Sequence, residues 1–144
     1  ATNAGALTAE QVAKFSSTQV GGLSTTALNG LTPEAMAAIA TTAISGLTTT
    51  QLGALSTANA GALNREQIAM LSAEQLTSLS SADVNTFTNE EFAAITTNAM
   101  AGMTLSQVNG LGSTRAKMLS AYQIAALTDV STDFVKTRFT TLYA

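Results

Sequence analysis

The side chains that could do chemistry in this chain are few, and their spacing does not suit catalysis. Neither histidine nor cysteine occurs among the 144 residues, so there is no imidazole base, no thiolate nucleophile and no soft-metal site. Nine Asp and Glu residues remain, of which only Glu90 and Glu91 are adjacent. A calcium loop needs several oxygen ligands within about a dozen residues. We therefore expect no enzyme activity and no cofactor or metal, and read Glu90-Glu91 as a solvated helix start.

The charge of the chain disfavours two classes of partner. Charged residues make up 10% of the sequence, against about 25% in a typical soluble domain. The net charge is -3, and the six Lys and Arg residues are scattered, which gives no basic patch for nucleic acid or anionic lipid. No apolar run approaches the roughly 18 residues that span a bilayer. We expect no nucleic-acid partner and no membrane insertion, and a secretion signal, if one exists, would lie outside this chain.

Threonines at one recurring position could bind a ligand. They are Thr25, Thr41, Thr49 and Thr57. In a regular solenoid these hydroxyls and methyls would form rows at constant spacing, suited to ice, a polysaccharide or a protein partner. The rows break at Arg65 and Ala73, and threonine also serves as a soluble spacer residue of low charge. Both interpretations stay open at this point.

The elements that would position these residues are set by a period of eight. Sixteen consecutive positions at this spacing are large and apolar: Leu7, Phe15, Leu23, Leu31, Ile39, Leu47, Leu55, Leu63, Leu71, Leu79, Phe87, Ile95, Met103, Leu111, Leu119 and Leu127. Repeats of fixed short period are typical of solenoids. The unit is one octad, and we call these sixteen residues the first apolar column.

Each octad carries helix-start signals. The position after the first apolar column is Ser or Thr in thirteen octads and Asn64 in another, and such side chains accept a hydrogen bond from free amides at a helix start. Three residues later, Gln recurs at positions 11, 19, 51, 67, 75, 107 and 123, with Glu91 equivalent. This pairing is a capping box. A second apolar column follows one residue further on, and the two columns form a hydrophobic staple around the capping residue.

The remaining residues fit the same octad. The single proline, Pro33, follows the capping residue Thr32, at the first helical position, where a missing amide has no consequence. Glycines close several octads, at Gly22, Gly30, Gly46, Gly102 and Gly110. We expect them to end helices in a left-handed conformation.

These signals predict an all-α solenoid, a superhelix of very short capped helices with one helix in each octad. One long helix is excluded because the apolar spacing gives no fixed face at 3.6 residues per turn. A β-solenoid is the alternative, but Ala, Gln, Leu and Met favour helix. One-turn helices are unstable alone, so the octads must stack with both apolar columns inside. Handedness and the number of octads per turn stay open.

The two ends of the chain differ. Residues 1–131 are predicted to form the octad solenoid, and residues 1–6 keep its register, so we expect the array to continue into further repeats of a longer chain. Thr132 breaks the period. Residues 132–144 are predicted to form a C-terminal capping helix or a junction to another domain, with Phe134, Val135 and Phe139 near one face.

Units such as Leu47-Thr48-Thr49-Thr50-Gln51-Leu52 and Leu71-Ser72-Ala73-Glu74-Gln75-Leu76 resemble the tandem repeats of very large secreted and surface proteins of Gram-negative bacteria, including adhesin-like chains. The resemblance covers residues 1 to about 131. It implies an extracellular or cell-surface location and a structural role as a stalk or spacer. The alternative is an array that binds a glycan, ice or a protein partner through its threonine rows.

Overall fold

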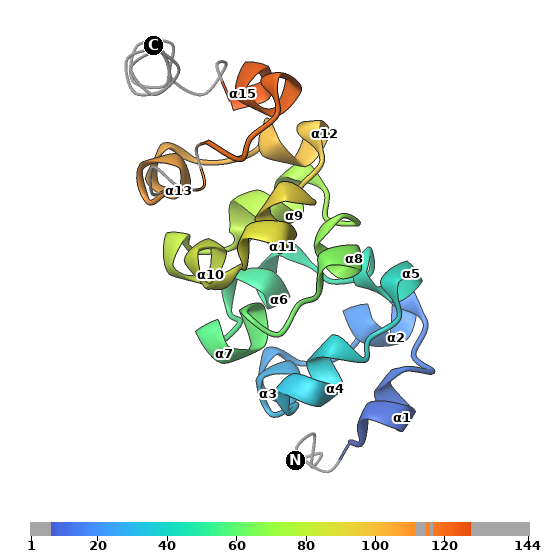
Figure 1. Ribbon diagram of the computed structural model, residues 1–144. Helices are drawn as coiled ribbons and strands as arrows, with labels where there is room; N and C mark the ends of the chain where they lie inside the picture. The colour runs from blue at the N-terminus through green and yellow to red at the C-terminus, as the bar shows by residue number, and fades with distance from the viewer. Residues whose placement is uncertain (1–6, 112–114, 116, 128–144) are drawn as a thin grey trace.

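The computed structural model describes residues 7–111, 115 and 117–127, in which short α-helices are joined by tight turns. The helices, shown in Figure 1, are α1 (Ala9–Val12), α2 (Ser17–Gly21), α3 (Thr25–Asn29), α4 (Pro33–Ala37), α5 (Thr41–Ile44), α6 (Thr49–Gly53), α7 (Thr57–Ala60), α8 (Arg65–Ile68), α9 (Ala73–Ser78), α10 (Ser81–Thr86), α11 (Asn89–Ala93), α12 (Thr97–Met100), α13 (Leu105–Asn109) and α15 (Ala121–Leu127). No strand occurs in these ranges. The all-α solenoid is therefore confirmed there, and the β-solenoid alternative is wrong.

The helices start where the capping residues predict. In α9 the Ser72 hydroxyl accepts from the Gln75 amide, and the Gln75 side chain accepts from the Ser72 amide, which completes a capping box. Pro33 occupies the first turn of α4, as predicted. Ala40 is the exception, because it precedes α5 without a side-chain hydrogen bond. The capping residue thus defines the start of its helix through contacts with residues no more than four positions away.

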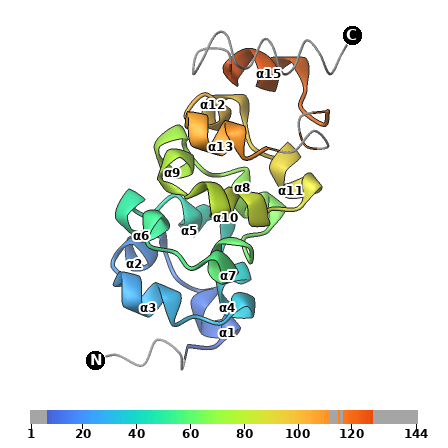
Figure 2. The same cartoon turned by 90° about the vertical axis from the view of Figure 1, so that its left-hand side faces the viewer.

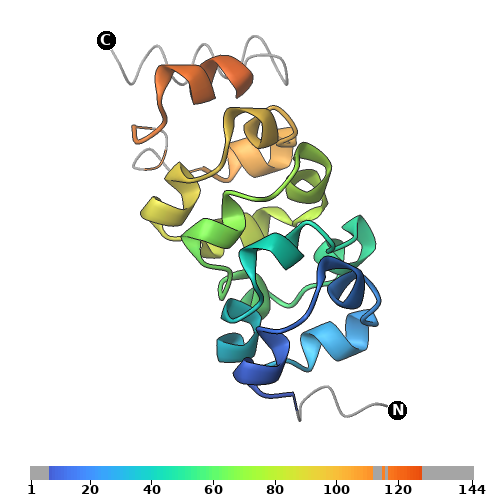
Figure 3. The same cartoon turned by 90° about the vertical axis from the view of Figure 1, so that its right-hand side faces the viewer.

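Helices three places apart in the sequence pack against each other along the superhelix. α1 packs on α4, α2 on α5, α6 on α9 and α12 on α15, and side-chain hydrogen bonds reach back as far as four octads. One turn of the superhelix therefore takes between three and four octads. The three views show α1 at one end of an elongated array and α15 at the other (Figures 1, 2 and 3).

Both apolar columns form the core. The first column is buried from Leu31 to Leu127, and the second is buried from Val12 to Val108. Only the first three members of the first column, Leu7, Phe15 and Leu23, are half-buried. The core is one continuous seam along the superhelix, as expected of a solenoid whose repeats cannot bury their apolar faces alone.

Leu71 and Met70 are neighbours in sequence that test which octad positions face the core and which face solvent. Leu71 is 3% exposed, whereas its neighbour Met70 is 47% exposed. Leu71→Ala should lower the free energy of unfolding by about 2–5 kcal/mol, because it leaves a cavity in the seam. Met70→Ala should change it by less than about 0.5 kcal/mol. Urea unfolding followed by circular dichroism measures both, and equal losses would contradict the assignment.

Gly22, Gly30 and Gly110 end α2, α3 and α13, as predicted, but the predicted left-handed conformation is wrong. No glycine in the described ranges has a positive φ, and the φ of Gly22 and Gly30 is -82° and -79°. Two of the glycines instead let successive turns approach closely. A Cβ on Gly46 would lie 2.7 Å from Ser17 Cα, and one on Gly102 would lie 2.9 Å from Ala73 Cα. Glycine is required there because backbone meets backbone.

Two predictions concern residues outside the described ranges. The C-terminal capping helix or junction at 132–144 lies there, as does the register of residues 1–6. Among the helices that the structure describes, none is long and apolar enough to cross a bilayer.

Candidate functional site

The recurring glutamine does more than complete a capping box. Gln67 is fully buried, and its Oε1 accepts from the Asn64 amide at 2.8 Å. Its Nε2 donates to Met36 and Ala37 oxygens, both at 3.2 Å, and to the Ile39 oxygen at 2.7 Å. Those carbonyls end α4, four octads earlier, where a helix leaves carbonyl groups without intrahelical partners. One side chain therefore caps the start of its own helix and the end of another.

We call such a bond to the helix four octads earlier an inter-turn rung. The glutamines that form one are Gln51, Gln67, Gln75, Gln107 and Gln123. Asn59, which is shorter, donates once, to the Leu28 oxygen at 3.1 Å. All six side chains are buried. The rungs tie each turn to the previous one by main-chain acceptors that any octad offers, whatever its side chains.

Arg115 replaces glutamine at the same octad position. Its guanidinium donates to the Val84, Asn85 and Phe87 oxygens, and it lies 5.8 Å from the centre of the Phe92 ring. Five N–H donors and a planar cation suit an acceptor cluster beside an aromatic face. A nitrogen donor other than a glutamine amide can therefore form the same contacts at this position.

Asp83 occupies the same octad position and is 3% exposed, but it has no nitrogen to donate. Its Oδ2 accepts from the amide and hydroxyl of Ser80. We expect Asp83→Asn to raise the free energy of unfolding by about 0.5–1.5 kcal/mol, since the new amide can donate to the Leu52 oxygen as Asn59 does to Leu28. Thermal melting measures this, and a lower melting temperature for the variant would refute it.

The predicted threonine row is distributed around the superhelix. Thr25 and Thr49 begin α3 and α6, which pack against each other. Thr41 begins α5, which packs on α2 and α8, and Thr57 begins α7, which packs on α4 and α10. Thr49 and Thr57 are exposed, whereas Thr25 and Thr41 are half-exposed. The structure therefore brings together the helices that Thr25 and Thr49 begin, and binding by the set of four stays a prediction.

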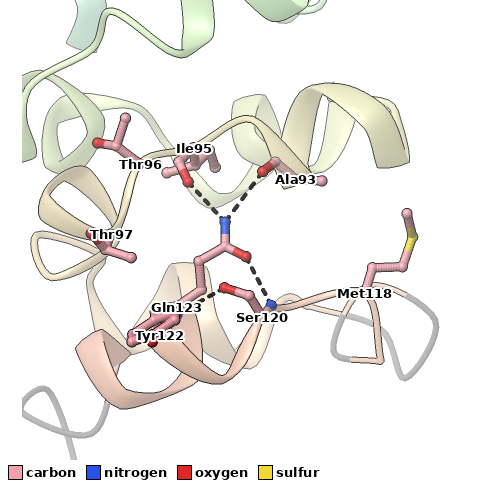
Figure 4. A pocket seen from close by; sticks show the side chains of 8 residues that line it. All are labelled: Ala93, Ile95, Thr96, Thr97, Met118, Ser120, Tyr122 and Gln123. Atoms are coloured by element: carbon pink, nitrogen blue, oxygen red, sulfur yellow. Dashed lines mark hydrogen bonds between the residues drawn. The ribbon is translucent and has the colours of Figure 1, made fainter.

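An open groove of about 700 Å³ lies between the α11–α12 connection and α15. Figure 4 shows Tyr122 and Met118 at its sides, and they are 80% and 40% exposed. Gln123 crosses the groove to donate to the Ala93 and Ile95 oxygens. The amide that could orient a ligand is thus already used as an inter-turn rung. Sequence reasoning missed this groove because its residues lie up to 30 positions apart.

The acidic residues serve the helix starts. Glu91 Oε2 accepts from the Thr88 amide at 2.7 Å in a capping box, while Glu90 is exposed beside it. Within the described ranges, no group of three or more His, Cys, Asp or Glu residues could hold a metal ion. The Glu91 carboxylate therefore has a structural role, because its hydrogen bond to the Thr88 amide helps to define the start of α11.

The chain matches no protein-family model, no curated protein and no solved structure.

Proposed function

We propose that the chain is a structural and interaction module, a repetitive stalk or spacer in a large extracellular or surface-bound bacterial protein of the adhesin-like kind. The observation that supports this most is the inter-turn rung. The most strongly recurring polar side chains are structural: the capping residues define the helix starts, and the buried glutamines join octads of successive turns. What the array offers is defined length and shape, and its outer surface carries hydroxyls and few charges.

Length is an additive property in this architecture. Each octad contacts mainly the octads three and four places away. The stability of such a solenoid is approximately a sum of repeat and neighbour terms, so octads can be added without redesigning the rest. We propose that the array is continuous with further repeats of the parent chain, and that a protein or glycan partner is met by other parts of that chain.

A second candidate, a surface-binding array, is favoured by one observation. Tyr122 and Met118 are unusually exposed apolar side chains beside the groove, and Thr97 lines it as well. An exposed aromatic ring with neighbouring hydroxyls can contact a glycan or a protein partner. This candidate needs the outer side chains, whereas a spacer needs only the length of the array.

A rescue experiment separates the two candidates. The parent protein is displayed on bacterial cells with these octads deleted in register, and adhesion to its target surface is measured. For a spacer, adhesion falls and is restored by an unrelated rigid rod of matched length. For a binding array, the unrelated rod restores nothing.

Point variants provide the matched control. Thr41→Lys with Thr49→Lys, and separately Tyr122→Ala, keep the length of the array and alter its surface. A spacer predicts unchanged adhesion, unchanged glycan-array binding and no difference in thermal hysteresis relative to the wild type. Loss of adhesion in these folded variants, together with failure of the rod, would overturn the spacer proposal.

A further inference from the structure

The inter-turn rungs are distributed unevenly along the superhelix. The rung position, which lies three residues after the capping residue, holds Asp83, Glu91 and Ala99 in three successive octads. A carboxylate and a methyl group have no N–H to donate, so these octads cannot form a rung. Rungs occur on both sides of this gap, formed by Gln51, Asn59, Gln67 and Gln75 before it and by Gln107, Arg115 and Gln123 after it.

The gap covers most of one turn, because a turn takes between three and four octads. It corresponds to the packing of α10, α11 and α12 on α7, α8 and α9, and we call this interface the rung-free seam. Buried apolar side chains such as Val84, Phe92 and Met100 hold it together. Among the described residues, one side-chain hydrogen bond crosses the seam, from the Thr77 hydroxyl to the Gly102 oxygen. Apolar packing therefore supplies most of its stability.

The register of the rungs pairs acceptors with acceptors across the seam. Rungs reach carbonyls 31 and 28 residues earlier, as that of Gln107 does. That register gives Asp83, which is 3% exposed, the Leu52 and Leu55 oxygens. Glu91 has the same relation to the end of α7. A buried acceptor without a donor costs free energy, so the seam is weaker than the rung-tied interfaces on either side of it.

We propose that the rung-free seam is a yield point, where turns of the superhelix part under tension before the rung-tied interfaces beside it do. The inference rests on the proposed function, because a stalk is pulled from its two ends. The stability of a solenoid is approximately a sum of repeat and neighbour terms, so its turns separate where the neighbour term is small. The capping bonds lie within single octads, and the helices on both sides keep them when the seam opens.

A second group of rung positions without a donor lies nearer the N-terminus and comprises Ala27, Ala35 and Ala43. α4 and α5 pack there on α1 and α2. Groups of octads with and without rungs thus alternate along the array. Tension should separate it into rung-tied blocks, with an early step at each rung-free group. The step near the N-terminus is an internal reference, because changes in the seam do not touch it.

Optical tweezers test the proposal on the full chain. Handles are attached through Glu10→Cys and Tyr122→Cys, which are unique because the chain has no cysteine. We expect the wild type to extend in steps. Asp83→Asn with Glu91→Gln supplies two amide donors to the seam, so the rate of its opening step at a fixed force should fall about fivefold for each rung gained. The reference step should not change.

Two variants are matched controls. Glu90→Gln removes the same charge beside Glu91, but its exposed side chain lies outside the rung position, so every step should stay unchanged. Gln67→Ala removes a rung from a neighbouring interface. It should ease a later step and leave the seam's step as it is. Circular dichroism verifies that each variant is folded.

Three results would overturn the proposal. The first is extension of the wild type in one all-or-none step, and the second is an unchanged set of steps in the variant with two new amides. The third is an early step that Gln67→Ala accelerates, because the rung-tied interface would then be the one that opens. The adhesion rescue measures none of these steps, so this inference and the spacer proposal can fail separately.

Discussion

Gln67→Glu is expected to lower the free energy of unfolding by about 3–5 kcal/mol at neutral pH, which is what an uncompensated buried charge costs. The substitution replaces a donor by a carboxylate oxygen among the Met36, Ala37 and Ile39 oxygens, within 3.2 Å of each. Gln67 is fully buried, so water cannot screen the repulsion. Urea unfolding followed by circular dichroism at 222 nm measures the loss.

Gln19→Glu is the matched control for this variant. Gln19 also completes a capping box, but it is exposed and has no rung. A glutamate can fill the box, as Glu91 does with Thr88. The change in unfolding free energy should therefore stay below about 0.5 kcal/mol. If the two variants lose the same stability, the rungs contribute nothing and the glutamines act only as local caps.

Gly46→Ala is expected to destabilise the superhelix by about 3 kcal/mol or more, at or above the upper end of what overpacking usually costs. The new Cβ would lie 2.7 Å from Ser17 Cα and closer still to the Ser17 carbonyl oxygen. Backbone lies on both sides of this contact, so no rotamer change can relieve it. α2 and α5 would have to separate, and the melting temperature should fall by many degrees.

Gly22→Ala controls for the intrinsic effect of replacing a glycine. Gly22 has a φ of -82°, which alanine adopts without strain, and the nearest atom to an added Cβ is the Thr18 oxygen at 3.3 Å. The variant should be neutral, or more stable by up to about 1 kcal/mol because the unfolded chain loses freedom. A loss at position 22 equal to that at position 46 would contradict close approach as the reason for Gly46.

The local half of the fold could be predicted from the sequence because caps and staples act within one octad. The start of α9 is defined by contacts among Ser72, Gln75 and Leu76, which are no more than four residues apart. The types of these residues indicate which contacts they make. The same is true of Pro33 in α4. The burial of both apolar columns followed from the instability of one-turn helices in isolation.

The contacts between turns of the superhelix could not be predicted from the sequence. The octad motif is similar along the chain, so it does not indicate which other octad each one packs against. The separation of 28–31 residues between Gln67 and its acceptors depends on how the turns pack, and carbonyl acceptors leave no signature in the sequence. One signal was present, since a capping box tolerates glutamate as well, yet glutamine stands at this position in seven octads and glutamate in one. The role of Gly46 was misread for the same reason, because Ser17 lies 29 residues away.

Buried amide side chains join helices four octads apart in this superhelix, and nuclear Overhauser spectroscopy of the Gln67 side-chain amide in solution can observe such a contact. We expect cross-peaks from the Gln67 Nε2 protons to protons of Met36, Ala37 and Ile39, because the Nε2 atom lies within 3.2 Å of the oxygens of these residues. Cross-peaks confined to the octad of Gln67 itself, or to residues at any other separation, would contradict it.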